Sequence, residues 1–279
     1  MKTILLPTDF SKNSLNAINY AMGLFRNAPC NFYLLHVKKK SSFISDDVMT
    51  ANTSETIYET IVDTAKKSLF NIIKKIKEKY ANDKHHFEAI VDYDNFIDSI
   101  NQVSEKFNID LIIMGTKGAS GLAKVLFGSN TEHVINRGNI PVLAIPHNCK
   151  FSSLEKVAFT TSFSRLYTKE ELNPLANILS LHYSKLYVLH VFCDFDFSEE
   201  LSNNIDFFKT NFKYPFFKYL DVKDDDVYKT LHQFITSNTI KMIAMARGKH
   251  SFFERLFNSN TFKNIALNID IPFLVMKSN

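Results

Sequence analysis

The sequence has few cysteines and no long apolar run. Its three cysteines, Cys30, Cys149 and Cys193, are an odd number and form no Cys-x-x-Cys pair, so neither a disulfide framework nor a zinc motif is expected. No stretch of about eighteen apolar residues occurs, and the apolar run after Met1 is too short for a signal-peptide core. These absences argue against a membrane protein and predict a cytoplasmic location.

The sequence also lacks a strong excess of charge of one sign. The net charge is +4 over 279 residues, and basic runs at 38–40 and 74–79 are offset by acidic stretches such as 224–226. A nucleic-acid interface would gather Lys and Arg on one face with aromatic residues for stacking. Here most of the 26 Phe residues lie in apolar strand-like or helical patterns, so we expect no nucleic-acid partner.

What the sequence does have is two halves with the same order of elements. Short apolar runs alternate with longer amphipathic ones, which is typical of parallel strands connected by helices. Strands are predicted near 2–7, 31–37, 86–91, 110–114 and 141–145, and again near 155–160, 185–192, 215–221, 239–245 and 271–276. Helices of the first half are predicted near 12–26, 54–80, 95–107 and 129–137.

Four blocks of letters repeat in the same order in the two halves. The pairs are TDFS at 8–11 with TSFS at 161–164, LLHV at 34–37 with VLHV at 188–191, VLFGSNT at 125–131 with RLFNSNT at 255–261, and IPVL at 140–143 with IPFL at 271–274. Such self-similarity indicates an internal duplication. We therefore predict two domains, residues 1–148 and residues 154–279.

Two prolines indicate how the halves meet. Pro141 and Pro272 open the last predicted strand of each half, and proline is tolerated at a first strand position or at a sheet edge. An uncovered edge invites pairing, so we expect the halves to dock through these strands as an intrachain pseudo-dimer. A homodimer of the whole chain is left open.

Residues 114–134 carry the clearest sign of a ligand site. After an apolar strand come a glycine, two residues, a second glycine, nine residues, and then Gly-Ser at a predicted helix start. Glycine lets the backbone turn and approach a ligand closely, and free N–H groups at a helix start favour phosphate. The residues of this pattern are Gly115, Gly118, Gly128 and Ser129.

Two neighbouring features have alternative explanations. Ser129 and Glu132 also fit a capping box, with Ser at N-cap and Glu at N3, which is compatible with anion binding. Asp9 follows the first strand, and ligands of open α/β sheets sit beyond the carboxyl ends of strands, where the strand order reverses. In a 3-2-1-4-5 sheet, Asp9 and Gly115 would flank that point. Alternatively, the Asp-Phe-Ser segment only caps the helix near Lys12.

The glycine pattern in its strand–helix context resembles the universal stress protein family, over nearly the full length of the chain. The resemblance implies two Rossmann-like domains of the adenine nucleotide α-hydrolase type, each a five-stranded parallel sheet of order 3-2-1-4-5. It also implies an ATP site, with Mg²⁺ as a compatible companion held by phosphate oxygens and water. The implied binding residues are Pro7, Thr8, Asp9 and Val37 for adenine and ribose, and Met114, Gly115, Lys117, Gly118, Gly128, Ser129 and Asn130 around the phosphates.

The second half departs from this pattern. Aligned on the glycine block, Gly115 becomes Met245, Gly128 becomes Asn258 and Asp9 becomes Ser162, while Gly118 is retained as Gly248. Added side chains would fill the space that phosphate needs, so the second half is predicted to be degenerate and to bind no ATP. It is then either a structural partner or a pocket with a changed ligand.

The sequence thus favours an ATP-binding, nucleotide-responsive stress-response module that acts on a protein partner the sequence does not name. At most slow ATP hydrolysis is expected, because no general base or arginine finger is evident. Two alternatives stay open. One is a nucleotide-independent scaffold, and the other is an adenylyl-transferring ATP pyrophosphatase, which the glycine-free PTDFSKNS segment disfavours.

Overall fold

The computed structural model describes residues 1–38, 54–116, 128–163, 165–192, 199–221, 227–247 and 270–277. The first half consists of β1 (Lys2–Pro7), α1 (Lys12–Leu24), β2 (Cys30–Val37), α2 (Ser54–Tyr80), β3 (His85–Asp92), α3 (Phe96–Lys106), β4 (Leu111–Gly115), α4 (Ser129–Arg137) and β5 (Val142–Ile145). The second half consists of β6 (Lys156–Thr161), α5 (Lys169–His182), β7 (Lys185–Phe192), α6 (Glu199–Asn211), β8 (Phe216–Asp221), α7 (Val227–Asn238), β9 (Met242–Arg247) and β10 (Phe273–Lys277).

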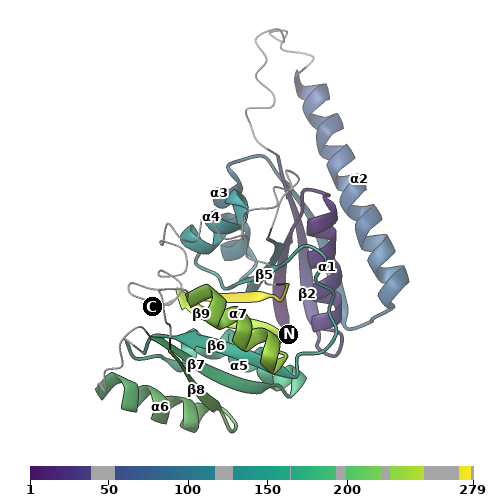
Figure 1. The fold of residues 1–279 in the computed structure, drawn as a ribbon. Helices are drawn as coiled ribbons and strands as arrows, with labels where there is room; N and C mark the ends of the chain where they lie inside the picture. The colour runs from purple at the N-terminus through teal and green to yellow at the C-terminus, as the bar shows by residue number, and fades with distance from the viewer. Residues whose placement is uncertain are drawn as a thin grey trace.

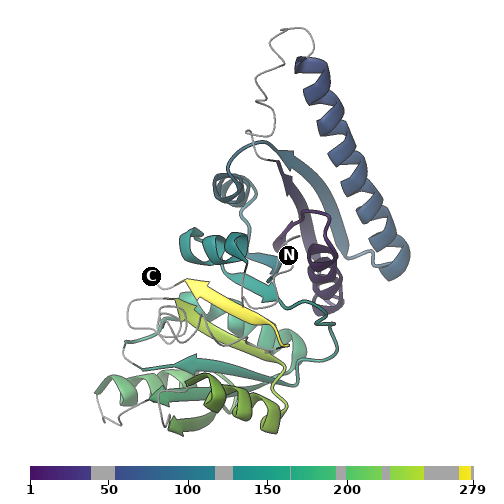
Figure 2. The same cartoon turned by 45° about the horizontal axis from the view of Figure 1, so that its top comes forward.

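The ten described strands form one continuous sheet in the order β3-β2-β1-β4-β5-β10-β9-β6-β7-β8 (Figures 1 and 2). Within each half the strands are parallel and follow the order 3-2-1-4-5, and the second half repeats the first in reverse across the junction. The predicted fold class is therefore confirmed. Such sheets need crossover helices, which the amphipathic stretches between the strands supply.

The junction between the halves is an antiparallel pairing of β5 with β10, in which Leu143 stands opposite Leu274. The predicted docking through the final strands is confirmed. Pro141 and Pro272 lie directly before these strands, and their carbonyls accept hydrogen bonds of 2.9 Å from Ile112 and Ile243 of the neighbouring strands. At this position the missing proline N–H removes no bond from the β5–β10 ladder.

The helices cover the sheet as two layers with separate cores. Buried residues of α1, α2, α5 and α6 pack on one face, where Leu6, Phe32 and Ile113 point. Buried residues of α3, α4 and α7 pack on the other face, with Leu5, Leu35 and Ile112. The period of two along the strands thus divides the apolar residues between two cores.

One predicted strand begins later than the sequence suggested. Residues 239–245 were expected as a strand, but β9 starts at Met242. Thr239 adopts a left-handed φ of 54°, and the N–H of Ile240 donates to the carbonyl of Ile235. These two residues therefore close the end of α7.

In the part of the chain that the structure describes, no helix is both long and apolar enough to cross a bilayer.

Candidate functional site

The turn after β1 is held by the hydroxyl group of Thr8. This hydroxyl accepts the N–H of Phe10 at 3.0 Å and lies 2.9 Å from the hydroxyl of Ser14. Phe10 has a φ of 64°, a left-handed conformation that is rare for a bulky residue. The bonds of Thr8 hold that strained turn, which leaves Asp9 exposed at its outer side.

Asp9 is a carboxylate at the carboxyl edge of the sheet, and it accepts the N–H of Ser11 at 3.0 Å. Burial alone would raise the pKa of Asp9, but hydrogen bonds from Ser11 and Ser14 outweigh it and hold the pKa below its ordinary value. The N-cap of α1 is Ser11, whose side chain accepts the N–H of Ser14. Within the Asp-Phe-Ser segment, capping is therefore the task of Ser11, and Asp9 remains an ionised acceptor at the sheet edge.

The end of β2 supports this corner. The Nδ1 atom of His36 lies 2.8 Å from the carbonyl oxygen of Thr8, and its ring centroid lies 4.4 Å from that of Phe10. His36 therefore has a structural role at this corner. Val37 is the half-buried last residue of β2, and continuing the pairing of Pro7 with Leu35 places it level with Asp9.

The start of α4 is fastened to the end of β4. The N–H of Gly128 donates to the carbonyl of Thr116, and the hydroxyl of Thr131 donates to the carbonyl of Gly115 at 2.8 Å. The second bond was not foreseen, because nothing in a single sequence marks a contact between these two segments. Together the two bonds place the helix start at the same sheet edge as Asp9, because β1 and β4 are paired neighbours.

The predicted capping box is wrong. Gly128 is the N-cap and makes no side-chain cap, while Ser129 is the first residue of the helix. The first helical bond runs from the N–H of Glu132 to the carbonyl of Gly128, which places Glu132 one residue too late for the N3 position. Because Gly128 has no side chain, it cannot cap the N–H groups at this helix start. Ser129 and Asn130 there are exposed.

The predicted role of Gly115 in close approach has a packing explanation. A Cβ atom on Gly115 would lie 3.1 Å from the backbone oxygen of Asn13 in α1, which is tighter than normal contact. Gly115 thus allows α1 to pack closely on β4. Gly128 has an ordinary φ of −66°, so its backbone conformation does not require glycine either. A left-handed turn is therefore not the reason for glycine at position 128.

The strand register changes the predicted comparison between the halves. Ile4 and Val157 each lie four residues before the threonine of the shared turn. Ile4 pairs with Leu111 of β4, and Val157 pairs with Met242 of β9. Leu111 of β4 therefore corresponds to Met242 of β9. This alignment differs by one residue from the alignment of the two glycine blocks.

The counterpart of Gly115 is therefore Ala246, and the predicted match with Met245 is wrong. Met245 corresponds to Met114, and both side chains are buried on the face covered by α3, α4 and α7. Ala246 is buried on the opposite face, in the core that includes residues of α1, α2, α5 and α6. A shift of one residue in a strand exchanges the two faces of the sheet. The alignment of the letters therefore named the wrong side chain as the one that replaces Gly115. The methyl group of Ala246, and no larger side chain, stands where Gly115 has a hydrogen.

The structure brings most of the predicted site residues to one edge of the first five strands. Pro7 and Thr8 are buried at the end of β1, and Met114 is buried at the end of β4, so only backbone atoms of Pro7 and Met114 are open to a ligand role. Lys117 and Gly118 lie outside the described residues, as do Gly248 and Asn258 of the second half. Their parts in phosphate binding remain predictions.

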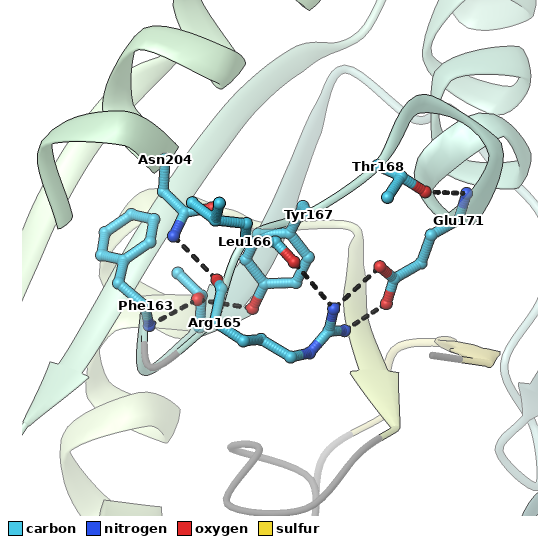
Figure 3. A network of polar contacts seen from close by, with 8 residues as sticks. Phe163, Arg165, Leu166, Tyr167, Thr168, Glu171 and Asn204 are labelled. Atoms are coloured by element: carbon cyan, nitrogen blue, oxygen red, sulfur yellow. Dashed lines mark hydrogen bonds and ion pairs between the residues drawn. The ribbon is translucent and has the colours of Figure 1, made fainter. Parts of the chain in front are cut away.

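The turn after β6 in the second half carries a network of polar side-chain contacts (Figure 3). Thr161 accepts the N–H of Phe163 at 2.8 Å and bonds the hydroxyl of Tyr167 at 2.6 Å, where Thr8 bonds Ser14. Arg165 forms a bidentate ion pair with Glu171, and its own carbonyl accepts the side-chain amide of Asn204 at 2.8 Å. Burial raises the pKa of Tyr167 to about 12, although the bond to Thr161 opposes it.

Parallel strands in the order 3-2-1-4-5, with helices on both faces, define each half as a Rossmann-like α/β fold, in which ligands sit at the carboxyl edge where the strand order reverses. The sequence profile of the Universal stress protein family matches residues 1–146, and the chain belongs to this family.

Individual relatives give the same result. Universal stress protein MJ0531 of Methanocaldococcus jannaschii is 31% identical over 144 residues, which cover 52% of this chain and 81% of the relative. Universal stress protein MJ0577 of the same organism is 26% identical over 156 residues, covering 52% and 94%. A crystal structure of a universal stress protein from Archaeoglobus fulgidus, 19% identical, covers 99% of this chain and 98% of its own with a TM-score of 0.72. The last likeness extends the fold over both halves.

Proposed function

We propose that the chain is an ATP-binding universal stress protein in which residues 1–148 hold one nucleotide and residues 154–279 form a degenerate domain that holds none. The observation that carries this proposal is the meeting of two chemically different features at one sheet edge. Asp9 supplies an exposed, ionised acceptor after β1. The start of α4, after the neighbouring β4, supplies N–H groups without a side-chain cap.

These two features suit a nucleoside phosphate better than free phosphate. A carboxylate accepts hydrogen bonds from ribose hydroxyls or an adenine amino group, whereas it repels an anion. The N–H groups and positive dipole end of α4 favour phosphate oxygens. In the proposed complex, Asp9 and the backbone near Pro7, Thr8 and Val37 hold the nucleoside. Phosphates lie against Gly128, Ser129 and Asn130, with Gly118 and Lys117 on the adjoining segment.

The proposed role is binding and response, with at most slow hydrolysis. Rapid phosphoryl transfer needs a group that positions the attacking water and a cation that stabilises the transition state. In this arrangement Asp9 is engaged with the nucleoside, away from the terminal phosphate. Any Mg²⁺ would be held by phosphate oxygens and water, as is common for this ion. The nucleotide state would then be communicated to a protein partner through the conformation of the sheet edge.

A nucleotide-independent scaffold is the second candidate, and one observation favours it. Gly115 is accounted for by its contact with Asn13, so this part of the glycine pattern is needed with or without a ligand. The scaffold would use both halves as one continuous surface.

Native mass spectrometry of the full chain distinguishes the candidates. The protein is mixed in turn with ATP, ADP, AMP and cyclic AMP at equal concentration, and the Gly128→Asn variant is the control. We expect one ATP per wild-type chain and much lower ATP occupancy on the variant. A chain that retains no nucleotide of any kind at millimolar concentration would favour the scaffold. Pyrophosphate release in the same mixture would instead support the adenylyl-transferring alternative.

A further inference from the structure

Arg247 of the second half contacts the far end of the helix that begins at the candidate site. It is the last residue of β9, and its guanidinium donates to the carbonyls of Ile135 and Gly138. Ile135 lies in the last turn of α4, and Gly138 is the C-cap of that helix. A cation that hydrogen-bonds carbonyls at a helix C-terminus compensates the negative end of the helix dipole.

The end of α4 is shaped for this contact. A Cβ atom on Gly138 would lie 2.5 Å from the carbonyl oxygen of Val134, which no side chain tolerates. Glycine therefore lets the chain turn closely under the helix. Beside it, the Nζ atom of Lys277 in β10 donates to the side chain of Asn139 at 3.1 Å. Arg247 thus joins an interface that continues from the β5–β10 pairing.

A second side chain contacts α1 in a similar way. His182, the last residue of α5, lies with Nε2 2.9 Å from the carbonyl oxygen of Leu24, the last residue of α1. Because this carbonyl only accepts, Nε2 carries the hydrogen. Burial lowers the pKa of His182, and the bond to Leu24 offsets that only in part. The ring is therefore neutral at pH 7 and donates as a neutral group.

Arg247 and His182 both contact the C-terminal end of a helix of the first half. α1 and α4 both begin at the sheet edge that holds Asp9 and Gly128, and both end at the opposite edge, where the second half holds them. The strand register places Thr116 of the first half at the position of Arg247. The short side chain of Thr116 has no guanidinium, so it cannot make the contact that Arg247 makes. With nine residues, α4 is only about 13 Å long, and a displaced C-terminus would tilt its start.

We propose that Arg247 is a positioning residue for the anion site of the first half. By fixing the C-terminal end of α4, it sets the direction in which the N–H groups near Gly128 point, and so sets the affinity for phosphate. The second half, which binds no nucleotide itself, would therefore tune binding in the first. This inference rests on the proposed function.

The test compares three variants of the full chain. Arg247→Thr copies the residue of the first half and removes the cap, Arg247→Lys keeps a cation, and Lys277→Ala removes a neighbouring contact that does not touch a helix carbonyl. Calorimetry measures the Kd for ATP and for adenosine, and hydrogen exchange follows the amides of residues 129–134. We expect Arg247→Thr to weaken ATP binding about fivefold, to leave adenosine binding unchanged and to speed exchange. Arg247→Lys should recover most of the ATP affinity, and Lys277→Ala should resemble wild type.

The pairing of ATP with adenosine separates positioning from general damage, because a loosened fold would weaken both ligands. Equal losses for the two ligands, or an unchanged ATP affinity in Arg247→Thr, would overturn the positioning role. A wild-type chain that binds neither ligand would refute the proposed function. If the wild-type chain binds neither ligand and Arg247→Thr still speeds exchange, Arg247 only stabilises α4. Both the proposed function and the positioning role would then be refuted.

Discussion

The turns after β1 and β6 share their backbone and differ in their side chains. Thr8 and Thr161 each accept the N–H of a phenylalanine two residues later, at 3.0 and 2.8 Å. Phe10 and Phe163 both adopt left-handed conformations, with φ of 64° and 51°. The strained turn is therefore a property of the duplicated fold, since it persists where the exposed acid has been replaced by Ser162.

The two turns differ in the side chain that bonds the threonine hydroxyl. The first half keeps a small Ser14 against its threonine, while the second half places Tyr167 there. In the second half, the ring of Tyr167 packs against Phe159 and Phe208 at centroid distances of 5.2 and 5.8 Å. The same scaffold thus presents polar groups in one half and extends its core in the other. The following predictions test that difference, from the largest expected effect to the smallest.

The largest effect is expected from Arg165→Ala in the second half. Glu171 is only 5% exposed and would lose the partner of its ion pair, so the free energy of unfolding should fall by about 3 kcal/mol. ATP affinity should stay unchanged, because this network belongs to the half that we propose to hold no nucleotide. Urea denaturation and calorimetry check both quantities. The double variant Arg165→Ala/Glu171→Gln is the control and should recover part of the loss, because it removes the unpaired charge. A drop in ATP affinity without a drop in stability would contradict this account.

Gly128→Asn should reduce ATP affinity about 100-fold with the fold intact. The substitution copies Asn258 and puts a side chain where phosphate is expected to meet the backbone. Calorimetry measures the affinity, and circular dichroism confirms the fold. Asn258→Gly is the matched control and should leave binding unchanged. A variant that binds within about threefold of wild type would show that phosphate lies elsewhere.

Asp9→Asn should reduce affinity about tenfold. The amide still accepts the N–H of Ser11, so the turn survives, but the stronger charged acceptor for the nucleoside is lost. The control is Asp110→Asn, because the carboxylate of Asp110 also accepts a backbone N–H, that of Thr3, at the opposite sheet edge. If both variants bind ATP equally well, Asp9 only holds its turn.

Gly115→Ala should lower the free energy of unfolding by about 1 kcal/mol and change ATP affinity only slightly. The new methyl group presses on the backbone of Asn13, while Ala246 shows that the second half accommodates alanine at this position. Thermal unfolding and calorimetry measure the two effects. A large loss of affinity at unchanged stability would return Gly115 to the phosphate site and reverse our packing explanation.

The smallest effect concerns pH and the contact between the halves at His182. Burial lowers the pKa of this ring below 6.5, so the unfolded chain binds its proton first as the pH falls. The stability contributed by neutral His182 is present above pH 6.5 and is lost as the pH falls through the lowered pKa. His182→Gln should therefore flatten the decline of unfolding free energy between about pH 7 and 5. Identical slopes for the two proteins would refute this linkage.

The fold and the edge that carries the site could be predicted because they depend on local patterns. Apolar alternation, the repeated letter blocks and the prolines before β5 and β10 are visible in a single sequence, and they led to the strands and to the docking of the halves. The sheet order came from the family resemblance. The placement of Asp9 and Gly128 at one edge followed from that order alone.

Other features depend on contacts that the sequence does not display. The spacing of Ser129 and Glu132 fits a capping box, but the N–H of Gly128 donates to the carbonyl of Thr116. The N-cap is therefore Gly128, one residue before the predicted N-cap. The counterpart of Gly115 was misassigned because letters do not show which face of a strand a residue occupies. Arg247 and Ile135 are 112 positions apart, and no local pattern joins them.

The most direct test of the asymmetry between the halves is a calorimetric titration of the full chain with ATP. We predict one site per chain. Two equivalent sites would contradict the degenerate second half, and the absence of heat at millimolar ATP would contradict nucleotide binding altogether.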